Sequence, residues 1–220
     1  MAAFYARRGF VVVIPDYRLV PDVTFPGPAE DVRDAISWVV HNPQHLISSG
    51  SPSPNPNRLI LMGHSAGAAH IATMLFNPNV LTLTDELRSK IAAAILISGP
   101  YDLGLMQTDW PSALAHEQYW GSLEVAKAND PLHLFQGLEE IFIERLPKIL
   151  LVEGEWEPDW LLGAGKALQQ ALIDRIQQPI QKIVALGHNH VSLTWALSTG
   201  QGEQWGEEVA EWCKRNFFPE

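Results

Sequence analysis

Residues 63–67 read GHSAG and place Ser65 between two glycines. The segment fits the pattern G-x-S-x-G, in which a nucleophilic serine sits on a sharp turn between a strand and a helix. Residues 59–62 are aliphatic and favour a strand, and residues from about 66 to 76 favour a helix. The glycines are expected to let the flanking segments approach each other closely. This context predicts a nucleophilic Ser65, and the alternative is a small-residue turn in which the serine only caps the helix.

A serine hydroxyl needs a general base, which is typically a histidine oriented by a carboxylate. After such a turn, the acid and the histidine come later in the chain, each following a further strand. Two segments supply candidates: 153–160, EGEWEPDW, and 187–193, GHNHVSL. The acidic candidates are Glu155, Glu157 and Asp159. The histidine candidates are His188 and His190.

The remaining histidines are expected to be surface or packing residues, because they fall on or next to predicted helices or in a long insertion. They are His41, His45, His70, His116 and His133. The H-x-H spacing of His188 and His190 also occurs in metal sites, but no further ligands of matching spacing accompany the pair. We therefore expect neither a metal nor another cofactor.

Apolar runs alternate with amphipathic segments along the chain. Residues 10–14, FVVVI, form an unbroken β-rich run before Pro15 and predict a strand buried on both faces. Further strands are expected at 59–62, 91–97, 149–152 and 180–186. Helices are expected at 28–41, 66–76, 160–176 and 204–217. This alternation predicts an α/β fold with a mostly parallel sheet and helices on both of its faces.

Two segments interrupt the alternation. Residues 48–57, SSGSPSPNPN, predict a surface loop because serine, proline and asparagine do not pack well. Residues from about 100 to 147 are too long for a simple crossover and too aromatic for a linker. They predict a small helical lid beside the active face, and the alternative is that their aromatic residues close a satellite core. We expect a single domain over residues 1–220 that includes this insertion.

Composition narrows the classes of function. The 220 residues carry a formal net charge of −10, which would repel a nucleic acid backbone. No apolar run approaches the roughly 20 residues that span a bilayer, and no signal-peptide pattern opens the chain. The single cysteine, Cys213, allows no internal disulfide. We expect a cytoplasmic protein that binds neither nucleic acid nor a membrane.

Several segments resemble the α/β-hydrolases of the esterase and arylformamidase type, which include kynurenine formamidase, feruloyl-esterase-like enzymes and hormone-sensitive-lipase relatives. The matching segments are VVVIPDYRLVP, FPGPAEDV, LMGHSAGAAH, ISGPYDL and LVEGEWEP. The resemblance runs over nearly the whole chain. It implies the α/β-hydrolase fold and a serine hydrolase that cleaves carboxylic esters or aryl amides through an acyl-enzyme.

The resemblance also selects among the candidate residues. Such families carry the acid in a G-x-x-D pattern, which falls on Glu157 in the segment GEWE, with glutamate in place of aspartate. The family histidine often appears as H-x-D or H-x-S before an aliphatic residue, which favours His190. The implied roles are nucleophile for Ser65, base for His190 and orienting acid for Glu157, with Asp159 and His188 in reserve.

One part of the family's machinery is absent from this sequence. The oxyanion of an acyl-transfer intermediate needs two or more donors; the backbone N–H of Ala66 would be one, and the family takes another from an upstream H-G-G-G type loop. The chain has no Gly-Gly dipeptide, and residues 1–9 resemble the helix that follows that loop. We expect an N-terminally shortened fold with reduced activity, and open strands that favour a homodimer.

The leading hypothesis is a serine hydrolase that acts on a small ester or amide. The candidates for contact with the substrate are Trp110, Trp120 and His64. The alternative hypothesis is a catalytically weak or inactive homologue that acts as a binding protein.

Overall fold

The computed structural model describes residues 1–51, 53–106 and 113–218. It contains a four-stranded sheet in the order β1-β2-β3-β4, in which every neighbouring pair is parallel. The strands are β1 (Leu59–His64), β2 (Ile91–Ile97), β3 (Lys148–Trp156) and β4 (Lys182–Asn189). All four were predicted from apolar runs. Parallel pairing brings their carboxyl ends to one edge of the sheet, where residues from distant parts of the chain meet.

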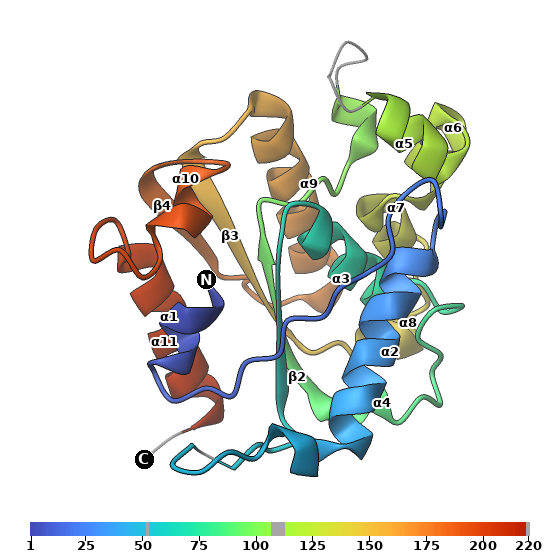
Figure 1. The fold of residues 1–220 in the computed structure, drawn as a ribbon. Helices are drawn as coiled ribbons and strands as arrows, with labels where there is room; N and C mark the ends of the chain where they lie inside the picture. Colours follow the sequence, from blue (N-terminus) through green and yellow to red (C-terminus); the bar gives the residue numbers. More distant parts are fainter. Residues whose placement is uncertain (52, 107–112, 219–220) are drawn as a thin grey trace.

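Helices cover both faces of the sheet, as predicted (Figure 1). One face carries α2 (Gly27–His41), α3 (Ala66–Phe76), α4 (Leu87–Lys90), α7 (Pro131–Gln136), α8 (Glu140–Ile143) and α9 (Asp159–Ile176). The other face carries α1 (Ala2–Ala6), α10 (Ser192–Ala196) and α11 (Gln204–Phe217). A short 3-10 helix, η1 (Pro43–Leu46), follows α2.

Strand β2 is apolar throughout because both of its faces are buried. Ala94 and Leu96 pack into the core shared with α3 and α9, whereas Ile95 and Ile97 pack into the core shared with α11. Successive side chains of a strand point to opposite faces, so a strand covered on both faces needs apolar residues at every position. The continuous run at 91–97 therefore identified an interior strand.

Residues 10–14 do not form a strand, and this prediction was wrong. They belong to an extended segment between α1 and α2 that crosses in front of the sheet in Figure 1. Val12, Val13 and Ile14 are 38%, 40% and 75% exposed. An apolar β-branched run favours extended backbone, but a strand also needs a neighbour for its hydrogen bonds. Within the described residues β1 is the edge of the sheet, and residues 10–14 do not pair with it.

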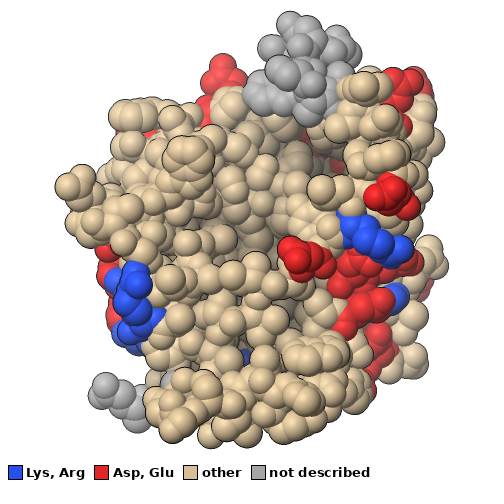
Figure 2. Space-filling view, viewed as in Figure 1, with Lys and Arg blue, Asp and Glu red and all other residues tan. Residues whose placement is uncertain are grey.

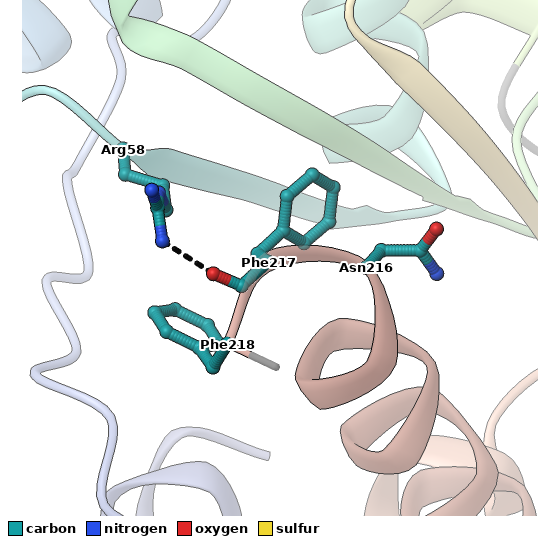
Figure 3. Close-up of a pocket in the computed structure, with 4 residues that line it drawn as sticks. All are labelled: Arg58, Asn216, Phe217 and Phe218. Carbon is teal, nitrogen blue, oxygen red and sulfur yellow. Dashed lines mark hydrogen bonds between the residues drawn. The ribbon is translucent and has the colours of Figure 1, made fainter. Parts of the chain in front are cut away.

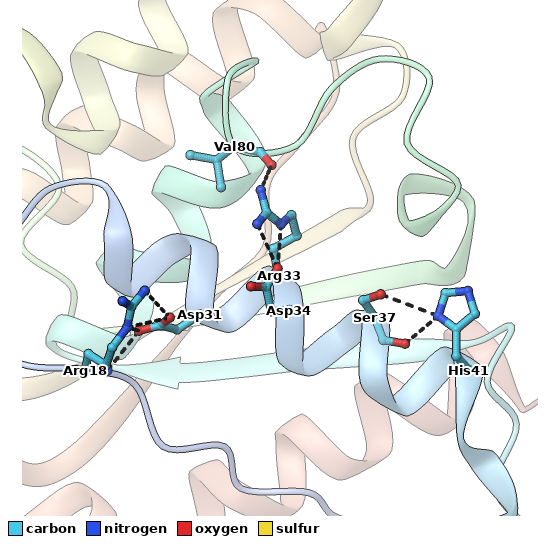
Figure 4. A network of polar contacts seen from close by, with 7 residues as sticks. All are labelled: Arg18, Asp31, Arg33, Asp34, Ser37, His41 and Val80. Carbon is cyan, nitrogen blue, oxygen red and sulfur yellow. Dashed lines mark hydrogen bonds and ion pairs between the residues drawn. The ribbon is translucent and has the colours of Figure 1, made fainter. Parts of the chain in front are cut away.

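Polar contacts fasten this extended segment to α2 (Figure 4). The Arg18 guanidinium pairs with the Asp31 carboxylate at 2.7 Å, and the Arg18 backbone N–H donates to the same carboxylate at 2.9 Å. Two residues further along α2, Arg33 donates to the Val80 carbonyl at 3.1 Å and so joins α2 to the loop after α3. An exposed ion pair contributes at most about 1 kcal/mol, so the Arg18 contacts orient the extended segment more than they stabilise it.

The segment predicted as a lid is helical where it is described. Its elements are η2 (Leu103–Leu105), α5 (Ala113–Trp120), α6 (Leu123–Asn129), α7 and α8. Figure 1 shows α5 and α6 beyond the carboxyl edge of the sheet. Phe135 and Phe142 of α7 and α8 are buried in the main core. Only α5 and α6 are therefore placed as a lid would be, and closure over the site stays a prediction.

The two tryptophans named as substrate contacts have different outcomes. Trp120 packs with Leu103 and Ala126 in a small separate cluster, and its ring stacks on Phe25 with 4.2 Å between centroids. This arrangement matches the satellite core that was the alternative interpretation of the aromatic residues, and contact of Trp120 with a substrate stays a prediction. Trp110 lies outside the described residues.

Charge is unevenly spread over the surface. Figure 2 shows acidic side chains gathered over α2, whose first half carries Glu30, Asp31 and Asp34, while most of the remaining face is uncharged. In the part of the chain that the structure describes, no helix combines the length and the apolarity needed to cross a bilayer.

Candidate active site

Ser65 joins β1 to α3 in an unusual backbone conformation. Its φ of 55° and ψ of −121° lie outside the regions that residues with a side chain favour. Such conformations cost on the order of 1–3 kcal/mol and cluster at functional sites. Two main-chain hydrogen bonds hold the turn: the Ser65 N–H donates to the Ile97 carbonyl of β2 at 2.9 Å, and the Ala68 N–H donates to the Ser65 carbonyl at 3.0 Å. The serine therefore stands at the carboxyl edge of the sheet.

The two glycines of the GHSAG segment are not equivalent. A Cβ added to Gly63 would lie 2.5 Å from the backbone carbonyl of Gly67, far inside van der Waals contact. A Cβ added to Gly67 would meet nothing within 4 Å. The expectation that close approach requires a residue without a side chain is confirmed for Gly63 and is wrong for Gly67.

Three side chains from separate elements form a chain of hydrogen bonds at this edge. The Nε2 atom of His190 lies 2.9 Å from the Ser65 Oγ, and its Nδ1 atom lies 2.8 Å from the Glu157 Oε2. Ser65 follows β1, Glu157 follows β3 and His190 follows β4. Because parallel strands end at a common edge, the fold brings together the serine, acid and histidine that the resemblance implied.

The charge of Glu157 is set by its surroundings. Only 1% of its side chain is exposed. Burial alone would raise the pKa of this carboxyl, but the hydrogen bond from His190, helped by Ser98 and the Gly154 N–H, lowers the pKa below its ordinary value. Glu157 is therefore ionised at neutral pH. An ionised carboxylate can only accept hydrogen bonds, so Nδ1 of His190 carries a proton, and in the neutral imidazole Nε2 then faces Ser65 as an acceptor.

The reserve candidates take no part in this chain of hydrogen bonds. Asp159 is exposed at the start of α9. His188 is buried, with its Nε2 2.8 Å from the Gly202 carbonyl oxygen and its Nδ1 3.3 Å from the Ser192 Oγ. The third acidic candidate, Glu155, accepts a hydrogen bond from a backbone N–H of β4 at 2.7 Å. Glu155 and His188 therefore hold the end of β4 rather than reach Ser65.

The H-x-H pair does not converge on one point. The ring nitrogens of His188 and those of His190 are directed to different partners. Over the ranges 1–51, 53–106 and 113–218, no group of three or more His, Cys, Asp or Glu side chains is arranged to hold a metal ion.

His64 lies against the histidine of this chain of hydrogen bonds. The ring centroids of His64 and His190 are 4.6 Å apart, and the rings are inclined by 40°. Burial lowers the pKa of His64 to about 4, and repulsion from a charged His190 acts in the same direction. His64 is therefore neutral at neutral pH. Its contact with a substrate stays a prediction.

Ser98 also acts on the carboxylate of the site, and the sequence analysis did not identify it. It follows β2 at the same edge with a φ of 46°, and its backbone N–H donates to the Val152 carbonyl at 2.9 Å. Its buried side chain is one of the influences that lower the pKa of Glu157. The sequence feature that could have identified Ser98 is its position as the first polar residue after the apolar run of β2.

Ala66 begins α3, immediately after the serine. The N–H groups of the first turn of a helix have no acceptor within the helix, and the helix dipole favours negative charge there. The backbone N–H of Ala66 is thus suited to face an anion that forms at Ser65.

A hollow in the surface lies at the opposite edge of the sheet. It is lined by Arg58, Asn216, Phe217 and Phe218 (Figure 3). Arg58 immediately precedes β1, and its guanidinium donates to the Phe217 carbonyl. Because Arg58 stands at the amino end of β1 and Ser65 at its carboxyl end, this hollow does not belong to the candidate active site.

Known proteins share parts of this sequence. Kynurenine formamidase from Drosophila melanogaster is 35% identical over 99 residues, which make up 44% of this chain and 29% of that protein. A probable isoprenylcysteine α-carbonyl methylesterase from Arabidopsis thaliana is 26% identical over 202 residues, which make up 86% of this chain and 40% of that protein.

Solved structures share the fold. Carboxyl esterase 2 from the fungus Tuber melanosporum matches with a TM-score of 0.69 at 18% identity, over 91% of this chain and 66% of that one. A bacterial heroin esterase matches with a TM-score of 0.66 at 20% identity, over 91% of this chain and 63% of that one. At these identities the likeness shows the fold alone.

Family membership follows from the extent of one match. The chain spans 29% and 40% of the two curated relatives and just under two thirds of the two solved esterases. The sequence model for the α/β-hydrolase fold matches residues 1–194, and this match confirms the resemblance stated from the sequence motifs. The chain belongs to the α/β-hydrolase fold family.

Proposed function

We propose that this protein is a serine hydrolase that cleaves a carboxylic ester or an aryl amide through an acyl-enzyme. The observation that carries the proposal is the continuous hydrogen-bonded series from Ser65 through His190 to Glu157, with distances of 2.9 Å and 2.8 Å. A nucleophile within hydrogen-bond reach of a base, which is itself oriented by a third group, is the arrangement that activates a serine.

The reaction begins with attack of the Ser65 oxygen on the carbonyl carbon of the substrate. As the C–O bond forms, the Ser65 proton moves to Nε2 of His190, and the carbonyl oxygen becomes an oxyanion that faces the backbone N–H of Ala66. The ionised Glu157 holds Nδ1–H and stabilises the imidazolium. His190 then gives its proton to the leaving alcohol or amine, and an ester of Ser65 remains.

Water completes the cycle by the same route. His190, which is neutral again, removes a proton from a water molecule as its oxygen attacks the acyl carbon. The bond to the Ser65 oxygen breaks, and the serine regains a proton from His190. The products are the carboxylic acid and the free enzyme. Every proton in this cycle moves between the substrate, water, Ser65 and His190, so the mechanism uses no cofactor.

The substrate class rests on the chemistry of the site and on the similar proteins. Formamidase, methylesterase and carboxyl esterase are names of proteins that this chain resembles over part of their length. Each name denotes attack on a carbonyl carbon that carries an oxygen or nitrogen leaving group. A small ester or an amide with an aromatic leaving group fits the proposed mechanism.

The experiment compares hydrolysis of p-nitrophenyl acetate and of formanilide by the wild type and by Ser65→Ala. We expect turnover of at least one substrate, and a loss of at least about 1,000-fold in kcat in the variant, because removing the nucleophile leaves only binding and oxyanion contacts. Ser89→Ala is a matched control, since Ser89 is an exposed serine on α4. Equal rates for the wild type and Ser65→Ala would contradict the proposal. A folded wild type without turnover would favour a binding protein.

A further inference from the structure

His64 ends β1 and faces the ring of His190. The 4.6 Å between ring centroids places the two imidazoles in contact. Ser65 is the next residue along the chain, so the strand that presents the nucleophile also presents a ring to the base.

Packing, rather than a hydrogen bond at Nε2, holds the His64 ring beside His190. The Nε2 atom of His64 is buried and, within the described residues, has no hydrogen-bond partner. The contact between the two residues is therefore ring against ring, at 4.6 Å between centroids.

The ring of His190 needs support from a flat neighbour. Its two hydrogen bonds, to Ser65 and Glu157, fix the positions of the two ring nitrogens. The ring can still tilt about the line that joins these two nitrogens, because the hydrogen bonds oppose that motion only weakly. In addition, 28% of the His190 side chain is exposed, so its surroundings do not fully enclose it. A ring packed against one face of the imidazole limits this tilt. Small errors in the position of a catalytic group are costly, and a shift of about 1 Å reduces rates by on the order of 100-fold.

A neutral His64 is compatible with its position beside the ring of His190. Burial, together with repulsion from a charged His190 and against the opposite effect of Glu157, lowers the pKa of His64 to about 4. His64 is thus neutral at neutral pH. It adds no positive charge beside the imidazolium that forms when His190 accepts the serine proton.

We propose that His64 is a positioning residue that holds the imidazole of His190 in line between Ser65 and Glu157 by packing its ring against it. The proposal rests on the proposed hydrolase function. It differs from the earlier expectation that His64 contacts the substrate, because a positioning residue changes kcat, whereas a substrate contact changes KM.

The test measures kcat and KM for p-nitrophenyl acetate, and the rate at which a fluorophosphonate labels Ser65, in the wild type, His64→Ala and His64→Phe. We expect His64→Ala to lose between about 10- and 100-fold in kcat and in labelling rate, with KM within about twofold. His64→Phe keeps a flat ring of similar size and should restore kcat to within about threefold of the wild type.

His70→Ala is the matched control. His70 is also a buried imidazole packed against an aromatic ring, with its centroid 4.7 Å from that of Tyr17. Thermal melting of each variant separates loss of fold from loss of positioning. Unchanged kcat in folded His64→Ala, or an equal loss in His64→Phe, would overturn the proposal. A rise in KM alone would overturn it in favour of substrate contact. A wild type with neither turnover nor labelling would instead refute the hydrolase function itself.

Discussion

The glutamate at the acid position reaches His190 although its side chain is longer than that of aspartate. Its Oε2 lies 2.8 Å from the His190 Nδ1, and its Oε1 lies 3.4 Å from the Gly154 N–H. A Cβ on Gly154 would lie 3.2 Å from the Glu157 Oε1 and 2.8 Å from the His188 carbonyl oxygen. The absence of a side chain at Gly154 therefore leaves room for the His188 main chain and for the Glu157 carboxylate.

Replacement of the acid tests which carboxylate orients the base. Glu157→Gln keeps the size of the side chain but removes its charge, so the preferred tautomer of His190 and the support of the imidazolium are both lost. We expect kcat for p-nitrophenyl acetate to fall by on the order of 1,000- to 10,000-fold. Asp159→Asn is the matched control and should stay within about twofold of the wild type. A larger loss in Asp159→Asn than in Glu157→Gln would show that the acid is assigned to the wrong residue.

At the scale of elements, the turn between β1 and α3 depends on one glycine more than on the other. Gly63→Ala forces a methyl group against the Gly67 backbone at 2.5 Å, whereas Gly67→Ala places one in open space. We expect Gly63→Ala to lower the free energy of unfolding by about 3 kcal/mol, at the upper end of the usual cost of overpacking. Gly67→Ala should leave it unchanged or raise it by up to about 1 kcal/mol, because alanine favours a helix.

Urea denaturation of the two glycine variants and the wild type provides the measurement. Similar midpoints for Gly63→Ala and Gly67→Ala would contradict the contact inferred at Gly63. Denaturation reports the fold and not catalysis, so this outcome would leave the roles of the site residues untouched.

Much of the fold could be predicted because the signals were local. The helices at 66–76 and 204–217 have the bounds that the sequence indicated, since a glycine-flanked turn and an amphipathic period mark them. The run at 10–14 gave an equally clear local signal and was wrong, because pairing depends on a neighbouring strand that a local pattern does not contain.

The candidate site likewise has features that the sequence predicts and features that only the fold reveals. The order of serine, acid and histidine and their places after strands were predictable from the chain. The choice of Glu157 over Asp159 depended on the resemblance to the α/β-hydrolases, because the residue types alone allowed both. The influence of Ser98 on Glu157 and the packing of His64 on His190 were not predictable, because they join residues that only the folded sheet brings together.

At the scale of the whole molecule, buried histidines couple stability to pH. Burial lowers the pKa of His70 from its ordinary 6.5 to about 4, and the charge of Asp31 acts in the opposite direction. Below pH 6.5 the unfolded chain binds a proton at His70 that the folded protein binds only near pH 4. The stability linked to His70 is therefore complete above pH 6.5 and is lost as the pH falls toward 4, by on the order of 3 kcal/mol.

His70→Phe isolates this contribution. The phenyl ring can pack against Tyr17 as the imidazole does but does not titrate. The free energy of unfolding of the wild type, measured by urea denaturation between pH 7 and pH 4, should fall more steeply than that of the variant. Parallel curves for the two proteins would show that His70 is not held neutral in the folded state.

The central claim is that Ser65 is an activated nucleophile. Fluorophosphonates phosphonylate a serine whose proton a neighbouring base can remove, and peptide mass spectrometry locates the modified residue. The account predicts close to one phosphonyl group per folded molecule, attached at Ser65, and none in Ser65→Ala or in protein unfolded with urea. Folded wild-type protein with Ser65 unmodified, or a label that persists in Ser65→Ala, would contradict the account.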